Sequence, residues 1–166
     1  GGMRVDGARL TAQLEALRQF GGTTAGGTHR VGYSDVDVAS RALVTSWMRE
    51  AGLTTSVDHA GNLIGRRPGA VDGLPPIVFG SHTDSVPDGG NYDGTVGVVA
   101  AIEVARMLHA AHVALRHPIE VAVWANEEGG LFGSRAVGGQ FDAAELTATT
   151  QSGRTVADGI RALGGD

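Results

Sequence analysis

The sequence predicts an α/β fold built on an open sheet. Two short apolar runs rich in β-branched residues, 77–79 and 119–124, are typical of buried strands. Between them, residues 95–111 carry apolar side chains nearly all round a helix, which indicates a helix packed against a sheet. Strand, helix and strand in this order form a βαβ unit. We therefore expect the two strands to be parallel and joined by a right-handed crossover.

The remaining elements follow from periodicity and from helix start and stop signals. Ser34 is a typical N-cap, and Asp35 and Asp37 behind it favour the first turn of a helix that ends before Gly52. Weaker signals after Gly133 predict short helices. The expected elements are a helix over 7–20, a helix after Ser34, strands over 53–57 and 63–66, helical turns over 134–137 and 141–146, and a helix over 155–163.

Composition narrows the functional classes. At 166 residues the chain forms one domain or part of one. Its formal charge of −5 argues against nucleic-acid binding. It has no cysteine, which excludes disulfides, thiolate catalysis and thiolate metal ligands. It shows neither a long apolar run nor a signal peptide, so we expect a cytoplasmic protein with no membrane partner.

Metal-competent side chains follow both strands of the βαβ unit. His82 and Asp84 lie two positions apart, so an extended backbone places them on one side, where a carboxylate can orient a metal-binding imidazole. Asp93 lies in a glycine-rich loop from which a carboxylate can bridge two cations. Of the adjacent Glu127 and Glu128, one can bind a cation while the other serves as a base.

Each of these motifs, taken singly, is more typical of a capped turn or a solvated surface. Their combination favours a metal site, because the carboxyl ends of neighbouring parallel strands meet at one edge of a sheet. The spacing alone leaves both interpretations open.

The motifs GSHTDSVPDGGNYDG (80–94) and VWANEEGG (123–130) resemble the M20 metallopeptidase family, in its branch of hydantoinase/carbamoylase-type amidases. This branch includes N-carbamoyl-L-amino-acid hydrolases, β-ureidopropionase and allantoate amidohydrolase. The resemblance extends over nearly the whole chain, including DHAGNLIGRRPG (58–69). It implies a partial catalytic domain with a mixed, mostly parallel sheet flanked by helices.

The resemblance also implies a role for each candidate residue. His82 would bind one divalent cation and Asp84 would orient it, Asp93 would bridge two cations, and Glu128 would bind the second. Glu127 would be the general base and proton shuttle. Two cations (Zn, Mn, Co or Ni) would activate a water that hydrolyses a linear C–N bond of a small N-carbamoyl, ureido or amide substrate.

Members of this family are more than twice as long, and they carry two further histidine ligands and a lid domain through which they dimerise. None of these features follows Asp166. We therefore expect residues 1–166 to be the N-terminal portion of the catalytic domain, with weak metal binding and little or no activity alone. Two alternatives are a non-catalytic α/β fragment that binds metal weakly and a peptidase- or aminoacylase-like member of the same family.

Overall fold

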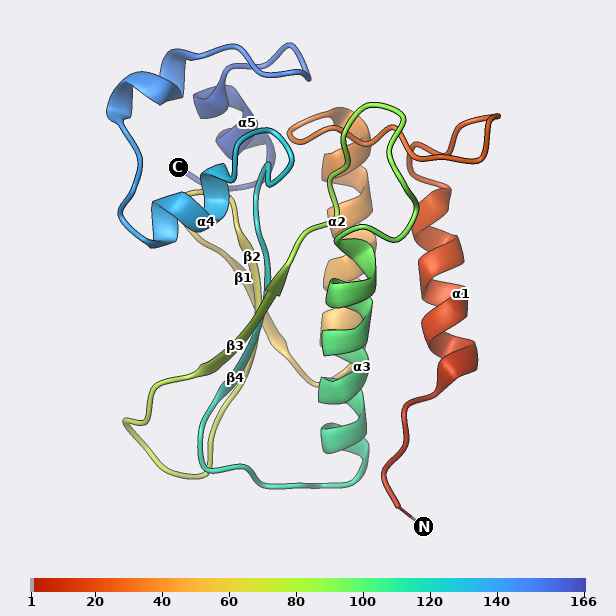
Figure 1. Cartoon of the computed structure of the whole chain (residues 1–166). Coiled ribbons are helices and arrows are strands. Elements are labelled where there is room, and N and C mark those ends of the chain that lie inside the picture. Colours follow the sequence, from red (N-terminus) through yellow and green to blue (C-terminus); the bar gives the residue numbers. More distant parts are fainter. Residues whose placement is uncertain (1) are drawn as a thin grey trace.

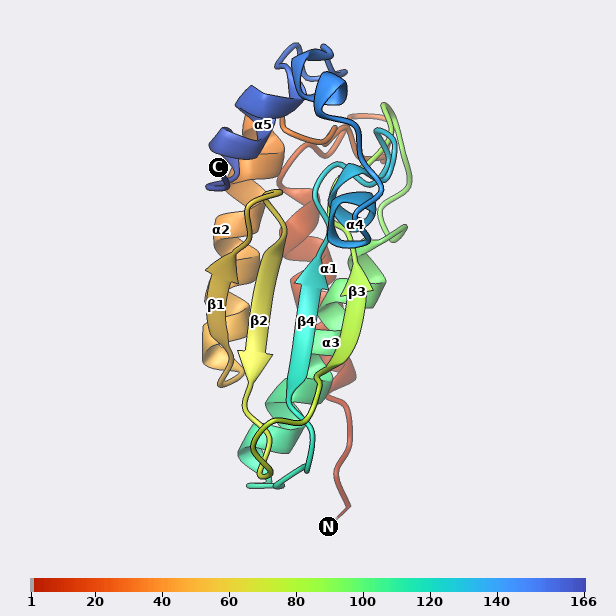
Figure 2. The same ribbon diagram turned by 90° about the vertical axis from the view of Figure 1, so that its left-hand side faces the viewer.

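A computed structural model describes residues 2–166 as a four-stranded sheet with three long helices along one face (Figures 1 and 2). The strands are β1 (Thr54–Val57), β2 (Leu63–Arg67), β3 (Ile77–Ser81) and β4 (Ile119–Val123). The helices are α1 (Gly7–Arg18), α2 (Asp35–Glu50), α3 (Thr95–Ala110), α4 (Phe132–Val137), the 3-10 helix η1 (Ala143–Thr147) and α5 (Val156–Ala162). Every element expected from the sequence is present, with boundaries shifted by at most two residues. No helix within residues 2–166 is both long enough and apolar enough to cross a bilayer.

The sheet has the strand order β1-β2-β4-β3, and Figure 2 shows its open face. β3 and β4 are parallel, with Ile77 opposite Ile119 and Ser81 opposite Val123, which confirms the predicted parallel pair. The other two pairings are antiparallel, so the sheet is mixed, as expected, but most of its pairings in these residues are antiparallel rather than parallel. The short turn between β1 and β2 forces these two strands to run in opposite directions, and β2 then lies antiparallel beside β4.

Two apolar clusters hold the site end of the sheet in place. The larger cluster fills the space between the sheet and helices α1, α2 and α3, with Val121 and Val123 of β4 at its centre and fully buried. The smaller one lies beyond the carboxyl end of β4, where Tyr33 and Phe132 pack with Ile160 of α5. The loop that leaves β4 therefore starts from packed structure on both sides.

β3 corrects one expectation. Its apolar residues were predicted to be buried, but Ile77, Val78 and Phe79 are 48%, 47% and 43% exposed. The strand lies at the edge of the sheet and pairs only with β4 in residues 2–166. α3, expected to be buried against the sheet, likewise leaves Val96 exposed beside this edge while its other side packs in the core.

Candidate metal centre

The loops after β3 and β4 leave the sheet side by side, because the two strands are parallel neighbours. His82 follows directly after β3, and its ring lies flat against Gly94 at the start of α3. A Cβ atom on Gly94 would lie 2.4 Å from that ring, and Gly94 has φ +76°. Only glycine fits here, because it has no Cβ atom to clash with the ring and because it readily adopts a positive φ. The end of β3 and the start of α3 therefore approach each other closely at this point.

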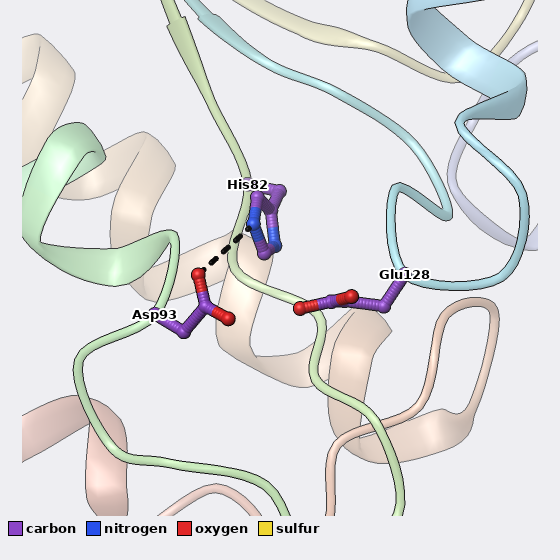
Figure 3. A group of neighbouring side chains, drawn as sticks. All are labelled: His82, Asp93 and Glu128. Atoms are coloured by element: carbon purple, nitrogen blue, oxygen red, sulfur yellow. Dashed lines mark ion pairs between the residues drawn. The ribbon is translucent and has the colours of Figure 1, made fainter.

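Three side chains converge where these loops meet. His82, Asp93 and Glu128 each offer a ligand atom, and these atoms all lie within 4.8 Å of one another (Figure 3). The imidazole Nε2 of His82 lies 3.9 Å from Oδ1 of Asp93. The fold thus brings together the three residues for which the sequence suggested a ligand role. Their function as ligands stays a prediction.

Hydrogen bonding orients the imidazole of His82. Its Nδ1 lies 2.9 Å from the main-chain carbonyl oxygen of Asp84, and a carbonyl can only accept, so Nδ1 carries the hydrogen. In the neutral ring this leaves the lone pair on Nε2, which faces Asp93 and lies 3.3 Å from Oε2 of Glu127. The Asp84 carboxylate, which was expected to orient the ring, is farther from Nδ1, at 3.7 Å.

The Asp84 carboxylate instead contacts the other loop. It is 2% exposed and accepts hydrogen bonds from the main-chain N–H groups of Glu127 (3.3 Å) and Glu128 (3.0 Å). Burial and the charge of Asp37 raise the pKa of Asp84 to about 6, against the opposing effect of these N–H groups. Asp84 therefore links the loop after β3 to the loop after β4.

The carboxylates around His82 repel one another. Burial, together with the nearby charges of Glu127 and Asp93, raises the pKa of Glu128. A cation bound among these groups would relieve the repulsion. One imidazole nitrogen with carboxylate oxygens is a donor set that suits Zn, Mn, Co and Ni, so the group could hold a divalent metal ion.

The turn that leads into Glu127 and Glu128 contains Asn126, a residue to which the sequence analysis gave no role. Asn126 has φ +49° and is 5% exposed. A Cβ atom on Gly32 or on Gly129 would lie 2.3 Å or 2.1 Å from its side-chain oxygen. The signal that could have found this position is its residue type, because asparagine is among the few side chains that tolerate this backbone region.

Fold and site together define an α/β domain with a histidine and carboxylate centre at the carboxyl edge of its sheet. Residues 62–152, more than half of the chain, match the model of peptidase family M28. The chain belongs to this family, which lies in the same clan of hydrolases as the M20 family that its motifs resemble. Sequence and structural similarity to hydantoinase/carbamoylase amidases confirms the expected resemblance.

Curated relatives and solved structures both show similarity to amidohydrolases. The chain is 40% identical to an N-carbamoyl-L-amino-acid amidohydrolase of Pseudomonas sp. (strain NS671), over 94% of this chain and 39% of the relative. It is 35% identical to a ureidoglycolate hydrolase of Arabidopsis thaliana, over 89% of this chain and 32% of the relative. A crystal structure of a hydantoinase/carbamoylase family amidase from Burkholderia ambifaria superposes with a TM-score of 0.91 at 38% identity, over 98% of this chain and 41% of that one. The chain thus spans roughly a third to two fifths of these relatives' length.

Proposed function

We propose that the chain carries part of the metal centre of a hydrolase that cleaves linear C–N bonds in N-carbamoyl amino acids or related ureido and amide compounds. The observation that carries this proposal is the convergence of His82, Asp93 and Glu128 within 4.8 Å. The names of the relatives support it, since they describe an N-carbamoyl-L-amino-acid amidohydrolase and a ureidoglycolate hydrolase. Hydrolysis of a carbamoyl substrate would yield the amino acid, ammonia and carbon dioxide.

Each side chain has a distinct task in this proposal. His82 and Glu128 would each hold one of two divalent cations, and Asp93 would supply a carboxylate to both. Such cations, when bound, lower the pKa of water and polarise the scissile carbonyl group. Glu127 has its carboxylate beside the ligands, 3.3 Å from Nε2 of His82, where it can take a proton from the attacking water. It then passes this proton to the leaving nitrogen.

We also propose that the chain, residues 1–166, is the N-terminal portion of the catalytic domain and is incompetent alone. Three ligand residues shared between two cations fall short of the three protein ligands that each catalytic zinc ion usually has. Weak metal binding and little or no turnover are therefore expected of this chain.

Calorimetric titration with Mn²⁺, Co²⁺ and Zn²⁺ tests the proposal. We expect measurable binding by the unmodified chain and a loss of at least about tenfold in affinity for Asp93→Asn. Asp88→Asn is the matched control, because Asp88 is an exposed acid on the same loop and belongs to no such group in residues 2–166. Absence of binding with all three metals, or equal affinity in Asp93→Asn, would contradict the proposed centre.

A peptide amide is the second candidate substrate, and the match to a peptidase family favours it. The two candidate substrates are distinguished by measuring hydrolysis of an N-carbamoyl amino acid and of a dipeptide, each in the presence of Mn²⁺, Co²⁺ or Zn²⁺. Preferential cleavage of the dipeptide would favour the peptidase. Efficient turnover of either compound would contradict the expectation that this chain is incompetent alone.

A further inference from the structure

A buried arginine lies behind the loop that carries His82 and Asp84. Arg30 is 2% exposed, and its Nε donates a hydrogen bond to the carbonyl oxygen of Thr83 at 2.7 Å. Its main chain pairs with Ser85: the Arg30 N–H donates to the hydroxyl at 2.9 Å, and the Ser85 N–H donates to the Arg30 carbonyl at 2.8 Å. Arg30 therefore contacts the loop on both sides of Asp84.

The other end of the guanidinium is fixed as well. Its Nη1 donates to the carbonyl oxygens of Leu17 at 2.8 Å and Phe20 at 2.6 Å, at the carboxyl end of α1. Phe20 lies just beyond α1, and the Leu17 carbonyl also accepts a hydrogen bond from the Phe20 N–H at 3.0 Å. Carbonyl groups at the carboxyl end of a helix carry partial negative charge, which favours a cation beside them. Burial lowers the pKa of Arg30, and the nearby charges of Asp37 and Asp84 oppose that shift. The buried cation is thus compensated on each side, and it bridges α1 to the metal-site loop.

We propose that Arg30 is a positioning residue for the candidate metal centre. By holding the Thr83 peptide, it directs the next carbonyl, that of Asp84, at Nδ1 of His82. This places the ring hydrogen on Nδ1 and leaves Nε2 free to face Asp93 and Glu127. Arg30 touches no metal ligand directly and acts only through residues 83–85. The inference rests on the proposed function in taking His82 as a ligand, but the ring tautomer can be measured without any metal.

The geometry explains why arginine occupies this position. The planar fork reaches Thr83 through Nε and the end of α1 through Nη1, so one side chain binds carbonyls in two directions. A lysine ammonium at this position could bind either the Thr83 carbonyl or the carbonyls at the end of α1, but not both. A purely structural role, in which Arg30 only caps α1, predicts the same loss of stability on substitution but no effect on His82. The two interpretations therefore differ in the state of the imidazole.

Ring ¹⁵N spectra of a ¹⁵N-histidine-labelled chain, recorded without metal at a pH where imidazole is neutral, test the proposal. His82→Gln assigns the signal. Arg41→Met is the matched control, because Arg41 is buried to a similar degree and donates to the carbonyls of Gly61 and Val123, but to none in residues 82–85. Urea unfolding of each variant measures stability in parallel.

We expect the unmodified chain and Arg41→Met to show His82 with its hydrogen on Nδ1. Arg30→Met should shift the ring toward the Nε2–H tautomer. The tautomer population of Arg30→Lys should lie between those of the unmodified chain and Arg30→Met. Co²⁺ affinity should fall about tenfold or more in Arg30→Met relative to Arg41→Met, as loss of a supporting residue does at other metal sites.

An unmodified chain with the Nε2–H tautomer, or Arg30→Met with an unchanged one, would overturn the proposal. If Arg30→Met does not fold, Ser85→Ala is the second variant. It removes the hydroxyl that accepts from the Arg30 N–H and that also donates to the carbonyls of Thr28 and Val86. A shift of His82 in the same direction supports the proposal, and an unchanged ring contradicts it. Failure of the proposed function has a different signature, since an unmodified chain that binds no metal could still show the expected tautomer.

Discussion

Asp84 and Glu128 lie 44 positions apart in the sequence, yet the Asp84 carboxylate accepts a hydrogen bond from the Glu128 N–H at 3.0 Å. One residue belongs to the loop after β3 and the other to the loop after β4. The bond fixes the two loops relative to each other, and so sets how closely His82 and Glu128 approach. It involves main-chain N–H groups, so it needs no metal ion to form.

Substituting Asp84 should change how stability depends on pH. The pKa of Asp84 is about 6 in the folded chain against an ordinary value of 3.8, so between these values the folded state holds a proton that the unfolded state has released. Raising the pH through this range therefore destabilises the unmodified chain, by about 3 kcal/mol from this group alone. Asp84→Asn has no such titration. Urea unfolding with a chelator present should show its stability rising relative to the unmodified chain from pH 4 to pH 6, whereas parallel curves would contradict the prediction.

The close approach of Gly94 to His82 predicts a sensitive glycine. Gly94→Ala adds a methyl group 2.4 Å from the His82 ring and also places a side chain at φ +76°. Gly73 has a similar φ of +79° but open space around it, so Gly73→Ala isolates the backbone cost, about 1 kcal/mol. We expect Gly94→Ala to unfold at lower urea than Gly73→Ala and to bind Co²⁺ at least about tenfold more weakly. Equal behaviour of the two variants would show that the ring moves aside freely.

The two adjacent glutamates should respond differently to neutralisation. Glu128→Gln removes a proposed ligand and should weaken metal binding more than the roughly tenfold typical of a supporting residue. Glu127→Gln should keep the affinity and lower the pH at which metal binding sets in. The reason is that Glu127 raises the pKa of Glu128, and a carboxylate must be deprotonated to bind metal. Calorimetric titrations over a pH series measure both effects, and an exchange of these two responses would mean that the roles are reversed.

The sequence predicted the elements, and the convergence of His82, Asp93 and Glu128, because both depend on local pattern. The βαβ unit around α3 brings His82, Asp93 and Glu128 to one sheet edge, and each element in it has its own periodicity. The buried state of β3 was predicted wrongly, because burial depends on which strands lie beside it. Arg30 was missed for a related reason, since the pairing of its segment with Ser85 leaves no periodic signal.

The exposed edge of β3 predicts self-association of this chain. Val78 is 47% exposed on a strand with one unpaired side in residues 2–166, and such edges pair readily with other strands. Val78→Lys should reduce association, because a charge on an edge strand opposes pairing, and the fold should tolerate it since Val78 lies opposite Glu120. Val137→Lys on α4, where Val137 is 61% exposed, adds the same charge away from the edge. Sedimentation velocity over a concentration series should show larger species for the unmodified chain and Val137→Lys than for Val78→Lys. A monomeric unmodified chain at every concentration would show that this edge does not drive association.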